Sequence, residues 1–161
     1  MTISVGDKIP DVEVRSLDDA GAPQAVRTGE VLGSGKVVLF AVPGAYTPGC
    51  SKIHLPGFVK GADDLFAKGV SRIACIAVND PWVMDAWGRE QGVDNKIMML
   101  ADGNGDFAKA MGLDFDGSGI GLGLRSQRYA AVIEDGTITS LDVEPKPGVD
   151  LSSCENVLTR L

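Results

Sequence analysis

Residues 36–58 of the chain read KVVLFAVPGAYTPGCSKIHLPGF, an apolar run followed by a turn rich in proline and glycine and then by a cysteine. The run Val37–Val42 is almost continuously apolar and has the length of a strand, which is typical of a strand covered on both faces. After the turn, Thr47 occupies the position of a helix N-cap, with Pro48 first and Cys50 third in the helix. The stretch therefore predicts a buried strand, a tight turn and a helix that carries a cysteine in its first turn.

The position of Cys50 bears on its chemistry. In the first turn of a helix, unpaired backbone N–H groups and the helix dipole favour a thiolate over a thiol, and the thiolate is the nucleophile. Pro43 and Pro48 fix two φ angles around the turn, and Gly44 and Gly49 let the backbone approach a ligand closely. The alternative is an ordinary buried residue, since a free cysteine usually behaves as a small hydrophobe. The residues of the turn leave both readings open.

The residues that follow Cys50 bear on the shape of the helix. Pro56 and Gly57 should break or kink it, because a proline inside a helix removes a hydrogen bond and costs about 3 kcal/mol. His54 lies four residues after Cys50, so the two would share one helix face. A histidine there either holds the thiolate or is a structural residue at the entrance of the site. A Cys-His hydrolase would also need an orienting Asn or Asp, which the sequence does not identify.

Short strands and helices alternate along the rest of the chain. A second apolar run, Arg72–Val78, follows the first, and between them apolar residues recur at helical spacing over Phe58–Phe66, up to Gly69. The other expected elements are a helix capped by Asp80 with Pro81 at its first position, a strand at Ile97–Leu100, a helix at Asp106–Met111, a β-hairpin of Tyr129–Ile133 and Thr137–Val143, a final helix at Leu151–Leu161, and edge strands near Val12, Val14 and Val26. The pattern predicts one α/β domain over residues 1–161, with a mixed central sheet and helices on both faces.

Composition and net charge limit the kinds of partner that the protein is expected to bind. Of the 161 residues, 44% are hydrophobic and 23% charged, and the net charge is −7. This charge repels phosphate backbones and anionic lipids, so neither nucleic acid nor a membrane is an expected partner. The N-terminus has no signal-peptide pattern, and the longest apolar run is too short to span a bilayer. We therefore expect a cytoplasmic protein, although a cleaved transit peptide would leave no trace.

The three cysteines stand far apart, at Cys50, Cys75 and Cys154, unlike the dense even set of a small secreted fold. A reducing compartment is therefore expected. There is no CxxC pair and only one histidine, so no metal site is expected. Cys75 lies in the middle of a predicted strand, where a small core residue fits. Residues 152–155, Ser-Ser-Cys-Glu, match a capping box that starts at Ser152 and puts Cys154 second in the last helix.

Several segments resemble one known family. Pro43, Thr47 and Cys50 form the pattern PxxxTxxC, which resembles the active-site motif of peroxiredoxins, and PGAYTPGCSKIHLPGF is similar to the type II, or peroxiredoxin-5-like, subfamily. The likeness continues in AVNDPWVMDAWGRE, MLADGNGDFAKAMGL, GLGLRSQRYAAVIEDG and DVEP, so that it covers nearly the whole chain. It implies a thioredoxin-like fold and a thiol peroxidase without a metal or an organic cofactor.

The resemblance also implies roles for individual residues. Cys50 would attack the O–O bond of hydrogen peroxide or an organic hydroperoxide and become a sulfenic acid. Thr47 would hydrogen-bond the thiolate and the peroxide, Arg128 would supply positive charge to both, and Pro43 would shield the site from water. Without the resemblance, Arg128 reads as a solvated charge at a strand edge. Arg125 is a weaker candidate, and its role can be limited to shaping the loop.

For the reduction of the Cys50 sulfenic acid back to the thiol, the resemblance leaves two routes. Members of the subfamily with an internal disulfide carry a cysteine near the last helix, although Cys154 falls about two residues later than expected when counted from the DVEP segment. Some plant-type members carry a second cysteine at the position of Cys75. Either residue is a candidate resolving cysteine. The other route is reduction from outside, by glutathione with glutaredoxin or by thioredoxin.

Two further segments have less specific interpretations. The glycine-rich loop Gly117–Gly123 lacks GxGxxG spacing and leads into a strand, so it reads as a mobile or tightly turned loop that carries Arg128 to the site. Trp82, Met84 and Trp87 stand at helical spacing and are core or dimer-interface residues, and the resemblance implies a homodimer. The rival functions are a thiol-disulfide reductase of the same fold, which the lack of CxxC disfavours, and a redox-sensing binding protein that turns over slowly.

Overall fold

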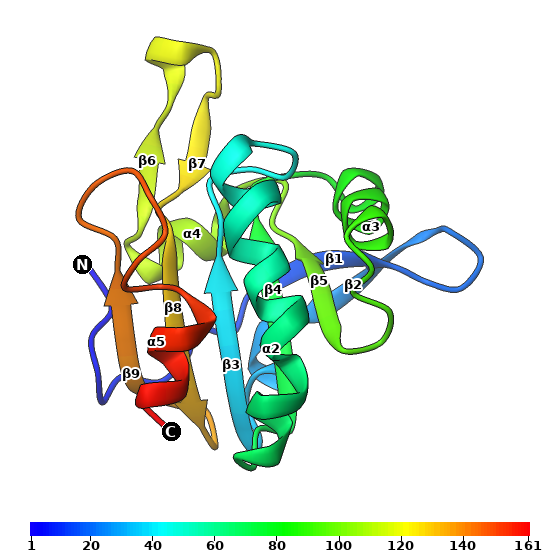
Figure 1. The fold of residues 1–161 in the computed structure, drawn as a ribbon. Coiled ribbons are helices and arrows are strands. Elements are labelled where there is room, and N and C mark those ends of the chain that lie inside the picture. The colour runs from blue at the N-terminus through cyan, green and yellow to red at the C-terminus, as the bar shows by residue number, and fades with distance from the viewer.

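The apolar run of the opening stretch is the centre of a seven-stranded mixed sheet. In the computed structural model, which describes residues 1–161, the strands lie in the order β2-β1-β5-β4-β3-β8-β9 (Figure 1). Their bounds are β1 Glu13–Leu17, β2 Pro23–Arg27, β3 Lys36–Ala41, β4 Arg72–Ala77, β5 Ile97–Ala101, β8 Tyr129–Glu134 and β9 Thr137–Val143. Strands β3, β4 and β5 are parallel, and the other neighbours pair antiparallel. The predicted mixed sheet is confirmed.

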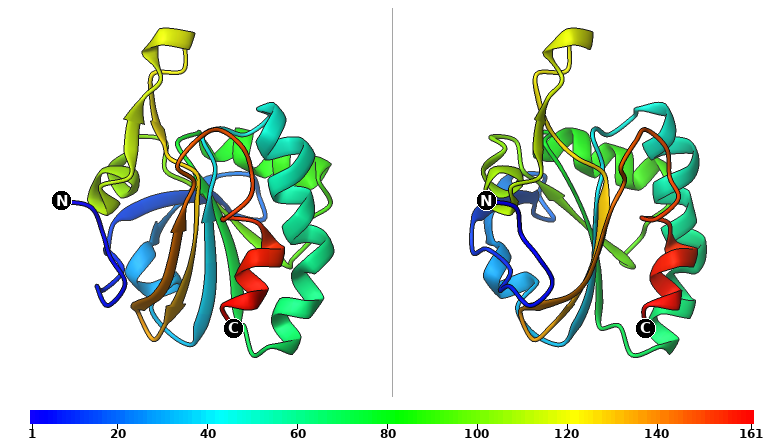
Figure 2. Two further views of the ribbon diagram at one scale, coloured as in Figure 1. Left: turned by 60° about the vertical axis from the view of Figure 1, so that its left-hand side comes forward. Right: turned by 90° about the vertical axis from the view of Figure 1, so that its left-hand side faces the viewer.

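Helices cover both faces of this sheet, because the central strands are apolar on both sides. Along β3, Val38 and Phe40 enter one core cluster, whereas Val37, Leu39 and Ala41 enter the other. The first cluster is covered by helices α2 (Leu55–Ala67), α3 (Pro81–Glu90) and α5 (Cys154–Thr159), and the second by α1 (Thr28–Val31), α4 (Asp106–Met111) and the N-terminal segment. Figure 2 shows α2 and α5 on one side of the sheet and the N-terminal segment on the other.

Local signals in the sequence predicted several elements correctly. Asp80 caps α3, and its carboxylate accepts a hydrogen bond of 2.8 Å from the Val83 N–H group. Strands β8 and β9 form the predicted hairpin, and Asp135 and Gly136 both have positive φ angles, 48° and 83°, as a type I′ turn requires. The one or two edge strands predicted near the N-terminus are the antiparallel pair β1 and β2, of which only β2 lies at the edge, because β1 also pairs with β5.

The helix after Cys50 differs from the prediction, because Pro56 and Gly57 do not break it. Helical backbone starts at Pro48, forms a π-helical turn over Cys50–His54 (η1) and continues without interruption as α2. In this turn the Leu55 N–H group bonds the carbonyl five residues earlier, that of Cys50. A proline ring clashes with the carbonyl four residues earlier in a regular α-helix. The wider turn just before Pro56 changes that spacing, so of the two expected outcomes, a break or a kink, the break was wrong: the helix is locally distorted and continues.

The last helix also differs from the prediction. It covers Cys154–Thr159 rather than Leu151–Leu161, and its N-cap is Ser153, whose hydroxyl accepts a hydrogen bond of 3.2 Å from the Asn156 N–H group. Cys154 is therefore first in the helix, not second. The predicted cap, Ser152, instead donates its hydroxyl hydrogen to the Glu144 carboxylate, a partner that the local pattern does not reveal.

The glycine-rich loop Gly117–Gly123 was expected to be either mobile or tightly turned, and in the structure it is tightly turned. Strands β6 (Asp114–Asp116) and β7 (Leu124–Ser126) pair antiparallel on either side of a short 3-10 helix, η2 (Ser118–Ile120). This second, two-stranded sheet projects from the rest of the molecule (Figure 1). None of the helices is both long and apolar enough to cross a membrane.

Candidate active site

The Cys50 sulfur lies at the start of the helical segment that follows β3 and has two hydrogen-bond donors. The Thr47 hydroxyl oxygen lies 2.8 Å from the sulfur, and the Arg128 Nη2 atom lies 3.1 Å from it. The same hydroxyl is 2.7 Å from the Gly44 carbonyl oxygen. Because a hydroxyl carries one hydrogen, Thr47 donates to either the sulfur or this carbonyl at any moment. Cys50 is fully buried, so both donors act on a desolvated sulfur.

Arg128 reaches this sulfur because β8, which begins at the next residue, pairs with β3, where Ala41 stands opposite Tyr129. Its approach depends on Gly49. A Cβ atom at this glycine would lie 3.1 Å from Nη2 of Arg128, so any larger side chain would press on the guanidinium group. Gly49 therefore makes room for the guanidinium of Arg128.

Gly44 makes room for Arg125 in the same way as Gly49 does for Arg128. A Cβ atom there would lie 2.7 Å from Nη1 of Arg125. Arg125 donates to the carbonyl oxygens of Leu122, at 3.0 Å, and of Pro43, at 3.3 Å, and makes no hydrogen bond to the cysteine. It joins the β6–β7 hairpin to the loop before Cys50, which agrees with a role in shaping the loop.

His54 holds Arg128 and does not contact the sulfur. Its Nε2 atom lies 2.9 Å from the Ser152 carbonyl oxygen, which can only accept, so the ring hydrogen is on Nε2. The Nδ1 atom is then free to accept from Nη1 of Arg128, at 2.8 Å. Burial, together with the positive charge of Arg128, lowers the pKa of His54 to about 3. The ring is therefore neutral at physiological pH, as an acceptor for a guanidinium must be.

A cleft of about 330 Å³ is lined by Pro43, Gly49 and Arg128, and elsewhere by Phe115 of β6 and by Glu144. Cys50 itself is buried and does not line the cleft, but Gly49 is its neighbour in the chain and Arg128 is hydrogen-bonded to its sulfur. The structure contains no group of three or more His, Cys, Asp or Glu side chains arranged to hold a metal ion.

Two contacts near the cysteine were not predicted. The indole N–H of Trp87 donates to the Ser51 hydroxyl at 2.9 Å, and the Gln91 amide donates to the Ser51 carbonyl at 3.2 Å, so α3 holds the residue next to Cys50. Trp87 is fully buried, as a core residue should be, whereas Trp82 is 55% exposed. Neither contact has a local sequence signal, because Ser51 and α3 are far apart in the chain.

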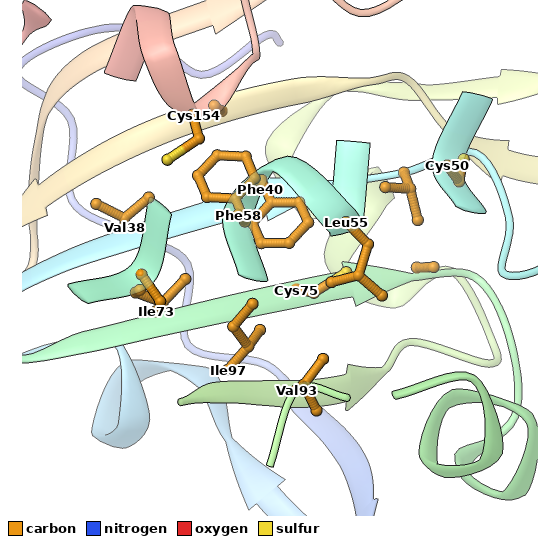
Figure 3. Close-up of a cluster of buried hydrophobic side chains, with 14 of the residues drawn as sticks. Val38, Phe40, Cys50, Leu55, Phe58, Ile73, Cys75, Val93, Ile97 and Cys154 are labelled. Atoms are coloured by element: carbon orange, nitrogen blue, oxygen red, sulfur yellow. The ribbon is translucent and has the colours of Figure 1, made fainter. Parts of the chain in front are cut away.

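The other two cysteines lie in less reactive surroundings, and no cysteine is in a disulfide. Cys75 is a core residue of β4, as expected, and burial raises its pKa well above the usual value. Burial, followed by the negative charges of Asp64 and Glu155, raises the pKa of Cys154 to about 11. In Figure 3 the side chains of Phe40 and Phe58 lie between Cys154 and Cys50.

Comparison with known proteins agrees with this site. Residues 4–158 match the redoxin family. The chain is 44% identical over 163 residues to the chloroplastic peroxiredoxin-2E of Arabidopsis thaliana, covering 99% of this chain and 70% of that protein. It is 39% identical over 159 residues to peroxiredoxin-2B of the same plant, covering 99% and 98%.

The chain is a peroxiredoxin. Among solved structures, that of reduced Prx3 from Vibrio vulnificus in complex with hydrogen peroxide superposes on this peroxiredoxin with a TM-score of 0.93 and 46% identity, covering 98% of each chain. The predicted thioredoxin-like fold and the predicted family are thereby confirmed. This peroxiredoxin is a thiol-dependent peroxidase, an oxidoreductase that acts on peroxide in antioxidant defence.

Proposed function

We propose that Cys50 is the peroxidatic nucleophile, that Thr47 and Arg128 activate it, and that Pro43 shields it from water. The observation that carries this proposal is the position of the Cys50 sulfur, within hydrogen-bond distance of both the Thr47 hydroxyl and the Arg128 guanidinium. Cys75 and Cys154 have no such pair of donors. His54 and Gly49 support the site through Arg128.

The proposed step is a displacement at oxygen. The Cys50 thiolate attacks one oxygen of the hydroperoxide, an S–O bond forms and the O–O bond breaks. The other oxygen leaves as hydroxide or alkoxide and takes up a proton, giving water or an alcohol and a cysteine sulfenic acid. Arg128 and the Thr47 hydroxyl stabilise the charge that develops on the leaving oxygen, because such donors are already aimed at the site before the reaction.

The direct test is the rate at which the reduced protein consumes hydrogen peroxide. We expect Cys50→Ser to abolish peroxidase activity, whereas Cys75→Ser and Cys154→Ser keep the first oxidation step. Mass spectrometry with a sulfenic acid trap should place the new oxygen on Cys50. Undiminished activity of Cys50→Ser would refute the assignment.

For the reductant, we propose an external thiol, from glutathione with glutaredoxin or from thioredoxin. Cys154 is poorly placed for a disulfide with Cys50, because its sulfur packs against the α-carbon of Gly61. Gly61 comes eleven residues after Cys50 in the same helical segment, or roughly 16 Å along a helix axis. A disulfide requires α-carbons less than about 7 Å apart. Peptide mapping after one equivalent of peroxide should therefore find no disulfide between Cys50 and Cys154, and finding a disulfide of Cys50 with Cys154 or with Cys75 would identify the resolving cysteine.

We further propose that residues 1–161 are one domain that forms a homodimer in the cytoplasm. Both core clusters are built on the same sheet, which supports one domain. The exposed large apolar side chains include Tyr46 at 47%, Trp82 at 55% and Ile120 at 80%, and aromatic residues such as Tyr46 and Trp82 are enriched at interfaces. Three free cysteines favour a reducing compartment. Analytical ultracentrifugation tests the dimer, and cell fractionation with an antibody tests the location.

A further inference from the structure

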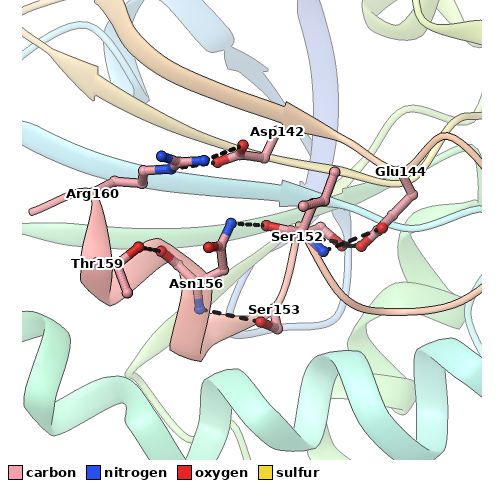
Figure 4. A network of polar contacts seen from close by, with 8 residues as sticks. Asp142, Glu144, Ser152, Ser153, Asn156, Thr159 and Arg160 are labelled. Carbon is pink, nitrogen blue, oxygen red and sulfur yellow. Dashed lines mark hydrogen bonds and ion pairs between the residues drawn. The ribbon is translucent and has the colours of Figure 1, made fainter.

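The carboxylate of Glu144, which directly follows β9, has four hydrogen-bond donors from one short loop. It accepts from the backbone N–H groups of Asp150 at 2.7 Å, Leu151 at 3.3 Å and Ser152 at 2.8 Å, and from the Ser152 hydroxyl at 2.6 Å (Figure 4). The Glu144 N–H group also donates to the Arg128 carbonyl, at 2.9 Å. One side chain thus holds the loop of residues 150–152 beside the strand that starts after Arg128.

These bonds keep the carboxylate charged. Partial burial alone would raise the pKa of Glu144, but the hydrogen bonds from Ser152, Asp150 and Leu151 outweigh it and hold the pKa below its usual value. Hydrogen bonds to an ionised acceptor are stronger than neutral ones. The loop is therefore held firmly at neutral pH.

A continuous chain of contacts leads from this loop to the reactive sulfur. Ser152 is fully buried, and its carbonyl accepts from Nε2 of His54. The Nδ1 atom of His54 accepts from Nη1 of Arg128, whose Nη2 atom donates to the Cys50 sulfur. Because a guanidinium is planar and rigid, holding Nη1 sets the direction of Nη2.

We propose that Glu144 is a positioning residue for the peroxidase reaction: it fixes the Ser152 carbonyl, which orients His54 and, through His54, the guanidinium of Arg128 at the Cys50 sulfur. The inference rests on the proposed roles of Cys50 and Arg128. Glu144 acts through these residues, and its carboxylate makes no contact with the sulfur.

Asp142, in strand β9, offers a matched control for the substitution of Glu144. Asp142, two residues before Glu144, also points toward the C-terminal segment (Figure 4), where its carboxylate binds Arg160 at 2.8 Å and 3.1 Å. Asp142 anchors the end of this segment beyond α5 and has no link to the Ser152 carbonyl. If Glu144 served only to anchor the C-terminal segment, replacing Asp142 should therefore affect the peroxidase reaction as much as replacing Glu144.

The test measures the rate constant for oxidation by hydrogen peroxide, followed by tryptophan fluorescence in a Trp82→Phe background, in which the signal comes from Trp87, hydrogen-bonded to Ser51 next to Cys50. Glu144→Gln keeps the size of the side chain but replaces one acceptor oxygen with an NH₂ group that faces N–H donors. We expect it to slow oxidation about tenfold, because small displacements of a catalytic group cost one to two orders of magnitude. Asp142→Asn should change the rate less than about twofold, because the Asp142 carboxylate pairs with Arg160 and has no bond to the loop of residues 150–152.

A coupling measurement separates positioning from general destabilisation. His54→Phe cuts the chain of contacts, so Glu144→Gln should add little in that background, because residues in one network are not additive. The inference fails if Glu144→Gln slows both backgrounds equally, or if Asp142→Asn slows oxidation as much as Glu144→Gln does. If Glu144→Gln does not fold, Glu144→Asp keeps the charge but shortens the side chain by one methylene, so the carboxylate no longer reaches its donors in residues 150–152, and oxidation should again be slowed. A wild-type protein no faster than a free thiol would instead refute the proposed function.

Discussion

Cys50 and Cys154 both lie in the first turn of a helical segment and both are buried, yet their surroundings are opposite. The sulfur of Cys50 has the cation of Arg128 at 3.1 Å, whereas the nearest charges that act on Cys154 are the anions of Asp64 and Glu155. A helix N-terminus favours a thiolate in both places. The comparison teaches that charges from distant parts of the chain, and not the helix position, make the surroundings of the two sulfurs different.

Removing the positive charge of Arg128 should have the largest effect on the rate of Cys50 oxidation. Arg128→Met is expected to slow oxidation of Cys50 by roughly 10²–10³-fold, the cost of losing one preorganised donor to a developing negative charge. Arg125→Met is the control, since Arg125 contacts the loop and not the sulfur. Stopped-flow measurement with hydrogen peroxide compares the two. Equal losses in both variants would show that the arginines act only on the shape of the loop.

The two helix caps provide the next comparison. Thr47→Val removes the hydroxyl at Cys50 and should cost about 1.5–3 kcal/mol in the oxidation barrier, the range for hydrogen bonds to charged groups. Ser153→Ala removes the cap before Cys154 and should lower the free energy of unfolding by about 1 kcal/mol without changing the rate. Denaturant unfolding and peroxide kinetics on both variants test this. A slow Ser153→Ala protein would contradict the assignment of catalysis to Cys50 alone.

His54 links the two regions and should make the protein sensitive to acid. Its pKa is about 3 in the folded state and about 6.5 when unfolded, so the unfolded chain binds an extra proton between these values. Stability from the neutral ring is therefore complete above pH 6.5 and is lost as the pH falls toward 3, by up to about 1.4 kcal/mol per pH unit. Urea unfolding from pH 7 to pH 5 should show a smaller slope for His54→Gln. An unchanged slope would mean that other groups cause the acid sensitivity.

The smallest of the expected effects is a change in the alkylation rate of the Cys154 thiol. Asp64→Asn with Glu155→Gln removes the two anions that raise the pKa of its thiol, and should increase its alkylation by iodoacetamide at pH 9 several-fold, because one pKa unit corresponds to a tenfold change in thiolate. Burial still holds the pKa up, so Cys154 should stay slower than Cys50. Peptide mapping follows each cysteine separately. No change in alkylation would leave burial as the only cause.

Much of the candidate site could be predicted because its signals are local. The order of Pro43, Thr47 and Cys50 indicates the turn, the cap and the proposed nucleophile within eight residues. Arg128 is different, since only the resemblance to peroxiredoxins pointed to it. Its position follows from the pairing of β8 with β3, a contact between segments about ninety residues apart.

The wrong predictions fail where a local rule is overridden, either by a neighbouring turn or by a distant contact. Pro56 was expected to break or kink the helix, but a π-helical turn directly before it accommodates the proline and the helix continues. Ser152 was expected to cap the last helix, but Glu144 takes its hydroxyl and Ser153 caps instead. A local pattern lists the bonds that a side chain can make and cannot rank them against partners elsewhere in the chain.

The sequence by itself determined the alternating strands and helices, the capped turn at Cys50 and, through its motifs, the family, because these depend on residues close together in the chain. Only the tertiary structure decided that His54 is neutral and holds Arg128, that Cys154 lies among anions, and that Glu144 holds the loop behind the site. Burial and electrostatic interactions depend on distances in space, and these exist only once the sheet has brought β3, β8 and the last helix together.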